Sequence, residues 1–364
     1  MRSSIKYSKK IAKFSTESTE KTCYTVFGGL VCEFFLYSMA PSGKNRLSNV
    51  CLDLDGQTGV IKVGMVKKNF DKDSWEIAQA YAGKLGEIPV SFSSTIRLLM
   101  MEYEQGSQKL SPANQSQTAM MLGSKSLHSM LHSAARLLFG DRLDNQSEVS
   151  KRELVTLFRP YELASILALA YLFRRSRRGV TTPLFDNRVS RLQLETNIGA
   201  LIGSAIPIIG LPLGLLCGGT PILAEFPFAM HDPSGYDDYL KHRGDRPYQQ
   251  DSEYEKARWG CTASQVAGCL LQLLGLGKVQ VELFGHGLIV GDHFESIENE
   301  EIYKISLSRV WITALVETGR PPEITHRGAY YPRQVDLDTL LKKIQMVKES
   351  PTEFCWLTAV GEQD

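Results

Sequence analysis

The chain has 364 residues, which is enough for two or three domains. Its composition, with 43% hydrophobic and 22% charged residues, is typical of a soluble globular protein. A net charge of +1 excludes the strong basic field that attracts nucleic acid or an anionic membrane. The seven scattered cysteines form no CxxC pair, so we expect reduced thiols in a cytoplasmic protein.

The first 20 residues are basic and polar, and they predict a mobile arm. They contain no apolar core followed by a small-residue cleavage site, so we expect no secretion signal.

Residues 21–86 predict a small α+β accessory segment. TCYTVF and VCEFFLYSMA are rich in β-branched and aromatic residues, as strands are. NVCLDLDGQTGVIKVGMV alternates apolar and polar residues on both sides of a turn, which predicts a hairpin. An amphipathic run over residues 74–85 predicts a helix that Gly86 ends.

From residue 88 onward the patterns are mainly helical. Apolar periodicity predicts helices over residues 92–103, 119–139, 151–175, 303–317 and 337–347. Residues 107–117 are polar and predict a loop. Residues 231–250 form a second polar region. We therefore expect a helical domain over residues 87–300, with the C-terminal helices of residues 301–364 packed on it.

Residues 196–224 carry no charge and are long enough to cross a membrane. The stretch also contains six glycines together with Pro207, Pro212 and Pro221. Prolines at this density would repeatedly break a spanning helix, so we predict short buried helices and no membrane span.

The stretch RWGCTASQVAGCLLQLLGLG, residues 258–277, combines the strongest local signals. Its apolar residues recur at helical spacing, so one face belongs in a core. Thr262 and Ser264 are candidate N-caps, and Gly275 and Gly277 are candidate ends of the helix.

Among the histidines, His128 and His132 lie four residues apart on one predicted helix face. This spacing suits two metal-binding imidazoles, but no third ligand is evident nearby, and two polar residues on a half-exposed helix face explain it as well. His231 and Asp232 form a second candidate pair. Their context, HDPSGYDDY, also predicts a turn followed by a solvated helix start.

Four arginines, Arg174, Arg175, Arg177 and Arg178, follow a predicted apolar helix. Cations at the carboxyl end of a helix favour its dipole, which explains the cluster without a ligand. The alternative is a docking patch for an acidic partner or a nucleotide phosphate.

The segment SEYEKARWGCTASQVAGCLLQLLGLG resembles the part of HDOD domains (HD-related output domains) in which a glutamate-rich helix leads to an aromatic-glycine pair, here Trp259 and Gly260. We expect this pair to be a structural anchor. Four other stretches match in the right order: LGEIPVSFSSTIRLLMM, LGSKSLHSMLHSAARLLFG, VTLFRPYELASILALAYLF and LGLLCGGTPIL. The resemblance implies an HD-like, all-helical core of the HDOD type and covers roughly residues 85–293.

The sequence departs from the metal-binding pattern of the related HD-type phosphohydrolases. On the resemblance, their His-Asp pair falls on Cys217 and Gly218, and a further histidine falls on Ala263. A downstream histidine pair falls near Gly285 and His286, where one histidine remains. A metal-activated water needs His and Asp ligands, which Cys-Gly and Ala cannot supply.

The resemblance thus implies a catalytically inactive regulatory protein that needs no cofactor. We expect it to act in bacterial signal transduction through an unidentified protein partner, with no nucleic-acid partner. Two alternatives stay open. One is a metal-dependent phosphohydrolase with an unconventional ligand set drawn from His128, His132, His231, Asp232 and His286. The other is a sensor that binds a nucleotide without hydrolysing it.

Overall fold

The computed structural model describes residues 20–27, 30–37, 50–54, 61–65, 72–143, 150–179, 183–244, 250–288, 297–324, 328–332, 334–350 and 356–357. The chain divides into two compact units, Met1–Phe70 and Asp71–Asp364. The predicted arm over residues 1–20 lies outside the described residues, except for Glu20, which begins the first strand.

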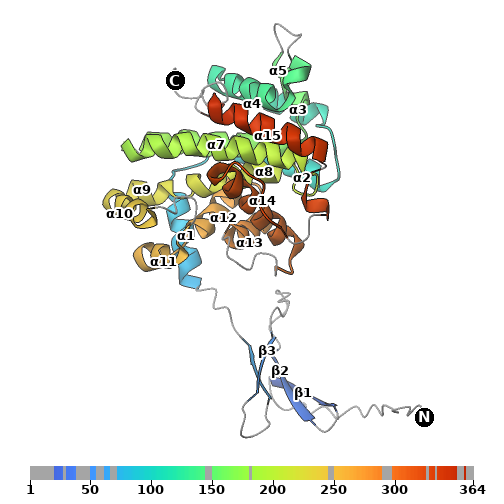
Figure 1. The fold of residues 1–364 in the computed structure, drawn as a ribbon, viewed down its shortest axis with the longest axis vertical. Helices are drawn as coiled ribbons and strands as arrows, with labels where there is room; N and C mark the ends of the chain where they lie inside the picture. Colours follow the sequence, from blue (N-terminus) through green and yellow to red (C-terminus); the bar gives the residue numbers. More distant parts are fainter. Residues whose placement is uncertain are drawn as a thin grey trace, which may run out of the picture. The chain divides into compact units, whose positions relative to one another are not determined.

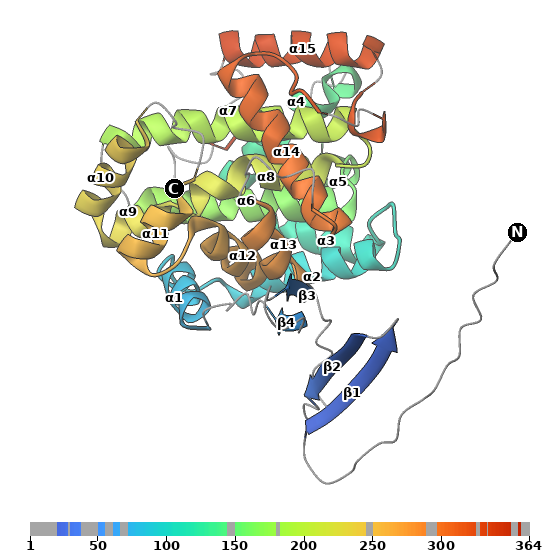
Figure 2. The ribbon, with the colours of Figure 1, turned by 60° about the horizontal axis from the view of Figure 1, so that its bottom comes forward.

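The described part of the N-terminal unit consists of two antiparallel strand pairs, as Figures 1 and 2 show. Strand β1 (Glu20–Phe27) pairs with β2 (Leu30–Tyr37), and β3 (Val50–Leu54) pairs with β4 (Ile61–Met65). In the second pair, Leu52 lies opposite Val63 and Leu54 lies opposite Ile61. The turn DGQTG expected between β3 and β4 falls outside the described residues.

The second unit is mainly helical, as predicted (Figure 1). Its described elements are α1 (Lys72–Gly83), α2 (Val90–Glu104), α3 (Pro112–Met121), α4 (Lys125–Leu143), α5 (Lys151–Thr156), α6 (Pro160–Gly179), α7 (Pro183–Ala205), α8 (Leu211–Leu223), α9 (Phe226–His231), α10 (Pro233–Arg243), α11 (Ser252–Trp259), α12 (Ala263–Leu274), α13 (Val279–Gly287), α14 (Glu300–Glu317), the 3-10 turn η2 (Gly328–Tyr330) and α15 (Gln334–Glu349).

Helices α7 and α8 form the centre of this unit. Helix α8 contacts α6, α7, α12 and α14, and Figure 1 shows α7 crossing the unit beside it. The two helices touch backbone to backbone, because a Cβ added to Gly199 would lie 2.2 Å from the carbonyl oxygen of Gly214. Only glycine permits such an approach, so the small residues of this stretch fix the spacing of the two helices.

The stretch Leu211–His231, which comprises α8 and α9, is long and apolar enough to cross a membrane. However, 94% of its most apolar window is buried inside the helical unit. Other helices of the same chain therefore cover the surface that lipid would cover in a membrane span. The uncharged residues 196–224 cover the end of α7, the connection 206–210 and α8. These helices are largely buried, as predicted, but α7 is not short, because it has 23 residues.

Several element bounds differ from the sequence-based expectations. The helix expected over residues 119–139 is divided between α3 and α4, and that over 151–175 between α5 and α6. Helix α1 packs against α12 and belongs to the helical unit, so the boundary lies before α1 and not at residue 86. The polar stretch 107–117 contains the start of α3. The hydroxyl of Ser111 accepts the N–H of Asn114, and Pro112 occupies the first helical turn.

Candidate functional site

Cys217 lies in the middle of α8, where the resemblance places a metal-binding histidine. Its side chain is fully buried, and the thiol donates to the carbonyl oxygen of Ile305 at a distance of 3.9 Å. Burial raises the pKa of this thiol to about 12, against the effect of Arg309. Since metals bind the thiolate, the surroundings hold Cys217 in the form that does not bind them.

Gly218 occupies the position where the resemblance places an aspartate. It is buried on the side of α8 that faces α7. A Cβ atom added to it would lie 2.3 Å from the carbonyl oxygen of Glu195 and 2.7 Å from the Cα atom of Thr196. Because both neighbours are backbone atoms, no side chain fits at this position without moving a helix.

The guanidinium group of Arg309, from α14, fills the space beside Cys217. Its Nη1 atom donates to the carbonyl oxygen of Cys217 at 2.9 Å and to Oε2 of Glu195 at 2.8 Å. Burial disfavours ionised Glu195, but Arg309 and Arg191 outweigh it and lower the pKa of the carboxyl. A fixed cation at this point of α8 repels a divalent metal ion.

Ala263, where a further metal-binding histidine would fall, is the first residue of α12 and is fully buried. Its N–H donates to Oε2 of Glu255 at 2.7 Å. The preceding residue, Thr262, caps the helix by accepting the N–H of Gln265, whose side chain in turn accepts the N–H of Thr262. The position is therefore a packed helix start with no metal-binding atom.

Asp232 acts as a helix cap and a cross-link. Its carboxylate accepts the N–H of Gly235 at 3.0 Å, Nε of Arg258 at 2.8 Å and the indole Nε1 of Trp259 at 3.3 Å. The bond from Arg258 is the main reason that its pKa is lowered to about 2. The carboxylate thus joins the start of α10 to the end of α11.

Trp259 and Gly260 fix the end of α11. The indole of Trp259 is 6% exposed and stacks on Phe228, with ring centroids 4.3 Å apart and planes inclined by 7°. Gly260 has a φ of +77°, a left-handed conformation that favours glycine, and an added Cβ would lie 2.8 Å from Cδ1 of Ile77.

The candidate histidine ligands are not brought together. His128 and His132 lie on α4, and His286 lies on α13. His231 is exposed at the end of α9, with its ring centroid 5.5 Å from that of Tyr81. Figure 1 shows α4, α9 and α13 in different parts of the helical unit. Within the described ranges, no group of three or more His, Cys, Asp or Glu side chains is arranged to hold a metal ion.

The arginines at the end of α6 do not form one patch with a common role. Arg175 donates through Nη2 to the carbonyl oxygen of Glu87 at 2.6 Å and through Nε to the hydroxyl of Tyr171 at 2.9 Å. It therefore fastens the segment before α2. Arg177 and Arg178 are exposed in the last turn of α6, where cations favour the helix dipole.

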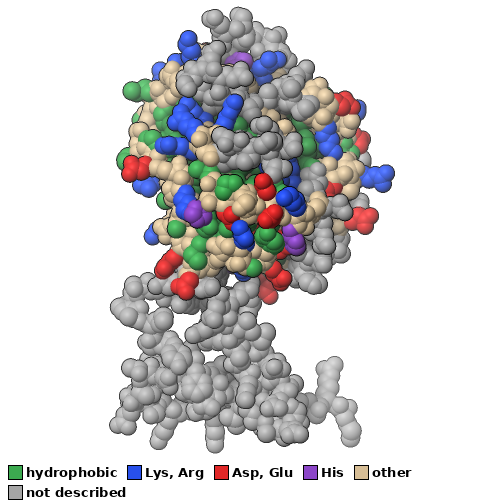
Figure 3. All heavy atoms as spheres, turned by 90° about the vertical axis from the view of Figure 1, so that its left-hand side faces the viewer, with side chains coloured by type: hydrophobic (Ala, Val, Ile, Leu, Met, Phe, Trp, Pro, Cys, Tyr) green, Lys and Arg blue, Asp and Glu red, His purple; other side chains and the backbone are tan. Residues whose placement is uncertain are grey.

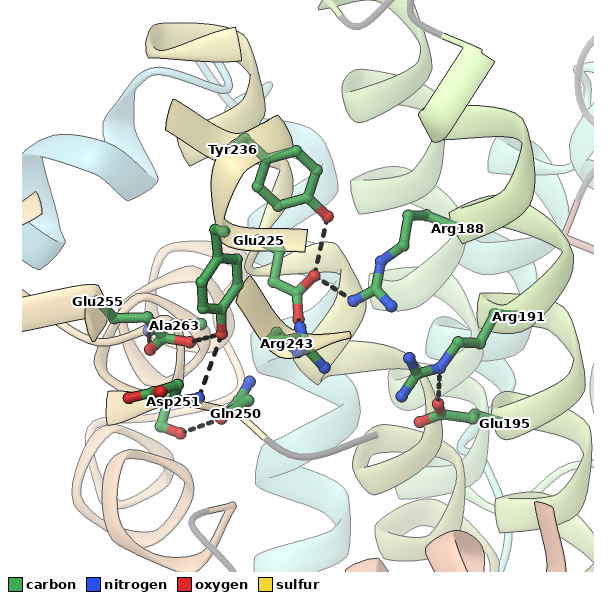
Figure 4. A network of polar contacts seen from close by, with 12 residues as sticks. Arg188, Arg191, Glu195, Glu225, Tyr236, Arg243, Gln250, Asp251, Glu255 and Ala263 are labelled. Atoms are coloured by element: carbon green, nitrogen blue, oxygen red, sulfur yellow. Dashed lines mark hydrogen bonds and ion pairs between the residues drawn. The ribbon is translucent and has the colours of Figure 1, made fainter. Parts of the chain in front are cut away.

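A buried ion-pair network joins α7 to the α9–α10 region (Figure 4). Glu225, just before α9, accepts bonds from Arg188 of α7, from Nη1 of Arg243 at 2.8 Å and from the hydroxyl of Tyr236 at 2.9 Å. Burial opposes its ionisation, yet Arg188 and Arg243 lower its pKa to about 2. Arg191, one turn further along α7, pairs with Glu195.

Glu255 is a further buried carboxyl beside this network, and Glu225 and Arg243 act on it electrostatically. It accepts the hydroxyl of Tyr239 as well as the N–H of Ala263. Burial raises its pKa to about 7, and these two hydrogen bonds do not fully compensate. Nearby, Oε1 of Gln250 accepts the hydroxyl of Ser264 at 2.7 Å, which ties the segment before α11 to α12.

A cavity of about 440 Å³ lies at the amino end of α8. Residues 207–213 form one wall, and Tyr103, Tyr161 and Leu283 contribute aromatic and apolar surface. One of its charged groups, Lys304, is bonded to Oε1 of Glu301 at 2.7 Å. Its lining includes none of the candidate metal ligands. The cavity is therefore separate from the positions at which the resemblance places metal ligands.

Figure 3 views the side of the molecule that lies at the left in Figure 1. Basic, acidic and apolar side chains are interspersed on this face, among the atoms drawn in colour. No field of a single sign covers it, in keeping with the net charge of +1.

The arginines of the buried network were missed by the sequence analysis. Arg188 and Glu225 are 37 residues apart, and Arg309 and Glu195 are 114 residues apart, so no local pattern joins them. One signal was readable, since Arg191 and Glu195 have the i, i+4 spacing of a helical ion pair.

No protein-family model matches the sequence, and no curated protein matches it. Among solved structures, the chain is similar to a crystal structure described as “Putative phosphohydrolase” from Shewanella amazonensis SB2B. The two share 10% sequence identity with a TM-score of 0.48, and the match covers 78% of this chain and 98% of that chain.

Proposed function

We propose that the chain is a non-catalytic regulatory protein of the HDOD type, which acts in bacterial signal transduction through a protein partner in the cytoplasm. One observation carries the proposal: a fixed guanidinium, that of Arg309, is bonded to Cys217 at the position where an HD-type hydrolase would hold its metal. The neighbouring positions, Gly218 and Ala263, have no metal-binding side chain and are closely packed.

The order of the helices supports the HDOD part of the proposal. The stretches that resemble HDOD domains fall on α2, α4, α6, α8 and the α11–α12 pair. Between α11 and α12, Gly260 makes the left-handed turn that an aromatic-glycine pair provides. These observations support a helical frame of the HDOD type with other residues at the metal-ligand positions.

The rival function, a phosphohydrolase with unconventional ligands, needs at least three convergent donors. Its candidates lie on α4, at the α9–α10 junction and on α13, and Asp232 already accepts three hydrogen bonds from protein groups. The geometry of the described side chains therefore favours a scaffold over this rival.

A hydrolysis assay tests the proposal. The purified full chain, incubated with Mn²⁺, Fe²⁺ or Ni²⁺, is assayed against bis(p-nitrophenyl) phosphate and cyclic dinucleotides, with an active HD-type hydrolase as positive control. We expect no turnover above the rate of a metal-only blank. Metal-dependent turnover that is lost on replacing His231, His286 or Asp232 contradicts the proposal.

The partner is tested separately, by capture from an extract of the chain's own host with the tagged full chain as bait. We expect a stoichiometric partner protein whose capture survives chelation of metals. Recovery of the bait alone under conditions of native expression contradicts this part of the proposal.

A further inference from the structure

The two sides of α4 differ in character. Apolar side chains on its inner side are buried in the core: Leu127, Met130, Leu131, Ala134 and Ala135. Its outer side carries a basic row, which consists of Lys125, His128, His132 and Arg136. These residues follow one another at spacings of three or four, so they lie along one line of the helix. Lys125 and Arg136 are exposed, and the two histidines are half-buried.

Helix α5 adds a further cation to the basic row. Helices α4 and α5 are in contact, and Lys151, the first residue of α5, is exposed. Burial, Lys151 and His132 together lower the pKa of His128. Lys151 and His132 thus lie near enough to His128 to act on it electrostatically. Since like charges at this spacing destabilise a helix, the stability of α4 does not explain the row.

No acidic side chain neutralises the basic row within the described ranges. Residues 125–139 contain neither aspartate nor glutamate. The ion pairs between described residues include no member of the row. The carboxylate of Glu153, in the first turn of α5, instead accepts the N–H of Ser150 in the cap of that helix. The row therefore presents positive charge with which an external acidic group can pair.

An exposed apolar side chain lies just before the row in the chain. Met120, in the last turn of α3, is 81% exposed, the largest fraction among the large hydrophobic side chains described. Four residues separate it from Lys125. Methionine adapts its shape to an apolar partner and is enriched at protein interfaces. The surface near the start of α4 thus offers an apolar contact as well as charge.

We propose that the basic row of α4, together with Lys151, binds the protein partner, and that the partner supplies an acidic helix with carboxylates spaced three or four residues apart. This inference rests on the proposed regulatory function and identifies the chemistry of its partner. The row spans about three helical turns, so one carboxylate of a facing helix meets each member. Ammonium and guanidinium groups bind carboxylates through charge-assisted hydrogen bonds, and an imidazole N–H donates to the same kind of acceptor.

Too few full charges gather here for a nucleic acid or an anionic membrane. The lowered pKa leaves His128 neutral at pH 7, and the row with Lys151 contains three lysines and arginines. Attachment to anionic lipid uses clusters of about four to eight such residues. Binding to nucleic acid rises with the number of phosphates that cations neutralise, and the whole chain has a net charge of +1. Carboxylates at short range, aided by an apolar contact, fit this surface better.

Fluorescence anisotropy with labelled peptides tests the surface. The probe is an alanine-rich helical peptide of about 20 residues with its glutamates in one row, three or four residues apart. A permuted peptide of the same composition distributes the glutamates around the helix. The full chain is titrated into each peptide at about 50 mM and about 150 mM potassium chloride. We expect the row peptide to bind at least about tenfold more tightly than the permuted peptide, and less tightly at the higher salt concentration.

The double variant Lys125→Glu/Arg136→Glu reverses the charge at both ends of the row. We expect its Kd for the row peptide to rise at least about tenfold, because attraction becomes repulsion. Lys342→Glu/Lys343→Glu, at two exposed lysines of α15, is the matched control, since it changes the net charge by the same amount and keeps the affinity. Circular dichroism checks that both variants fold. If the first does not, Lys125→Gln/Arg136→Gln replaces it.

Any of the following results overturns the proposal. Wild type does not bind the row peptide, or it binds both peptides equally well. Wild type and the row variant bind the row peptide with the same Kd. A single-stranded RNA or vesicles containing phosphatidylserine bind more tightly than the peptide, and the row variant loses that binding. Because the probes are synthetic, a chain that captures a partner from its host but fails here keeps the proposed function and loses only this surface.

Discussion

Nη1 of Arg309 lies 2.9 Å from the carbonyl oxygen of Cys217, and the same nitrogen lies 2.8 Å from Oε2 of Glu195. The side chain thus joins α14 to both α7 and α8 at the point where those two helices touch. The resemblance to HD-type phosphohydrolases places a metal ligand at Cys217, and here a cation of the protein itself is bonded to that residue. The same side chain therefore has two consequences. It holds three helices of the core together, and in our proposal it excludes a metal ion from the position beside Cys217.

Replacing Arg309 should be strongly destabilising. In Arg309→Met, Glu195 stays buried with Arg191 as its remaining ion-pair partner, so the free energy of unfolding should fall by about 3–5 kcal/mol. Urea denaturation measures the loss. Arg320→Met, at an exposed loop arginine, is the control and should change stability by no more than about 0.5 kcal/mol. Equal losses in the two variants would contradict the structural role of Arg309.

Gly218→Ala tests the close approach of α7 and α8. The added methyl group would lie 2.3 Å from the carbonyl oxygen of Glu195, so the helices must separate. We expect a loss of at least about 2 kcal/mol in a urea melt. Gly83→Ala is the matched control, because its Cβ meets nothing within 4 Å and should change stability by less than about 1 kcal/mol. A Gly218→Ala variant as stable as wild type would show that a side chain fits at this position.

Trp259→Ala tests the aromatic anchor. The indole is buried against Phe228, so its removal should cost roughly 3–5 kcal/mol of unfolding free energy. Met120→Ala, at a side chain that is 81% exposed, provides the comparison and should be nearly neutral. A loss below about 1 kcal/mol for Trp259→Ala would show that the ring contributes little to the core.

Glu255 should make stability depend on pH. Its pKa rises from 4.5 to about 7 on folding, mainly through burial, so the folded chain holds this proton more tightly than the unfolded chain. The stabilisation is fully present below pH 4.5 and is lost as the pH rises through about 7. Between pH 5 and pH 7.5, wild type should therefore lose roughly 1–3 kcal/mol of unfolding free energy.

The variant Glu255→Gln isolates this effect, because it keeps the shape of the side chain and removes its titration. Glu195 and Glu225 have lowered pKa values, so their stabilisation is lost only at lower pH and does not enter the same window. Urea melts across the pH range should show a flatter profile for Glu255→Gln. Parallel profiles for the two proteins would rule out a raised pKa at Glu255.

Local sequence signals predicted the helix starts and ends well. At α12, Thr262 was a candidate cap and Gly275 a candidate end, and the structure places both in these roles. The start of α10 at Asp232-Pro233 agrees with the helix start read from HDPSGYDDY. The missed helix α3 carried a similar signal, since it begins at Ser111-Pro112, a capping residue followed by proline. The polar composition of residues 107–117 had instead favoured a loop, because the apolar periodicity of this short helix is weak.

The buried network was not predictable in the same way. Charged residues usually face solvent, so the sequence gives no reason to place Arg188, Arg243 or Glu225 in a core. Their burial follows from contacts between segments that are far apart in the chain. The sequence shows that Cys217, Gly218 and Ala263 stand where the resemblance places metal ligands, but it contains no sign that Arg309 lies beside Cys217.

The metal content of the purified chain tests the central claim most directly. The full chain is prepared without chelators, incubated with Mn²⁺, Fe²⁺, Ni²⁺ or Zn²⁺, desalted, and measured by inductively coupled plasma mass spectrometry. Since Arg309 and packed backbone fill the expected site, we predict far less than one ion per chain for every metal. One tightly held ion per chain, lost in Cys217→Ala or His286→Ala, would contradict the account.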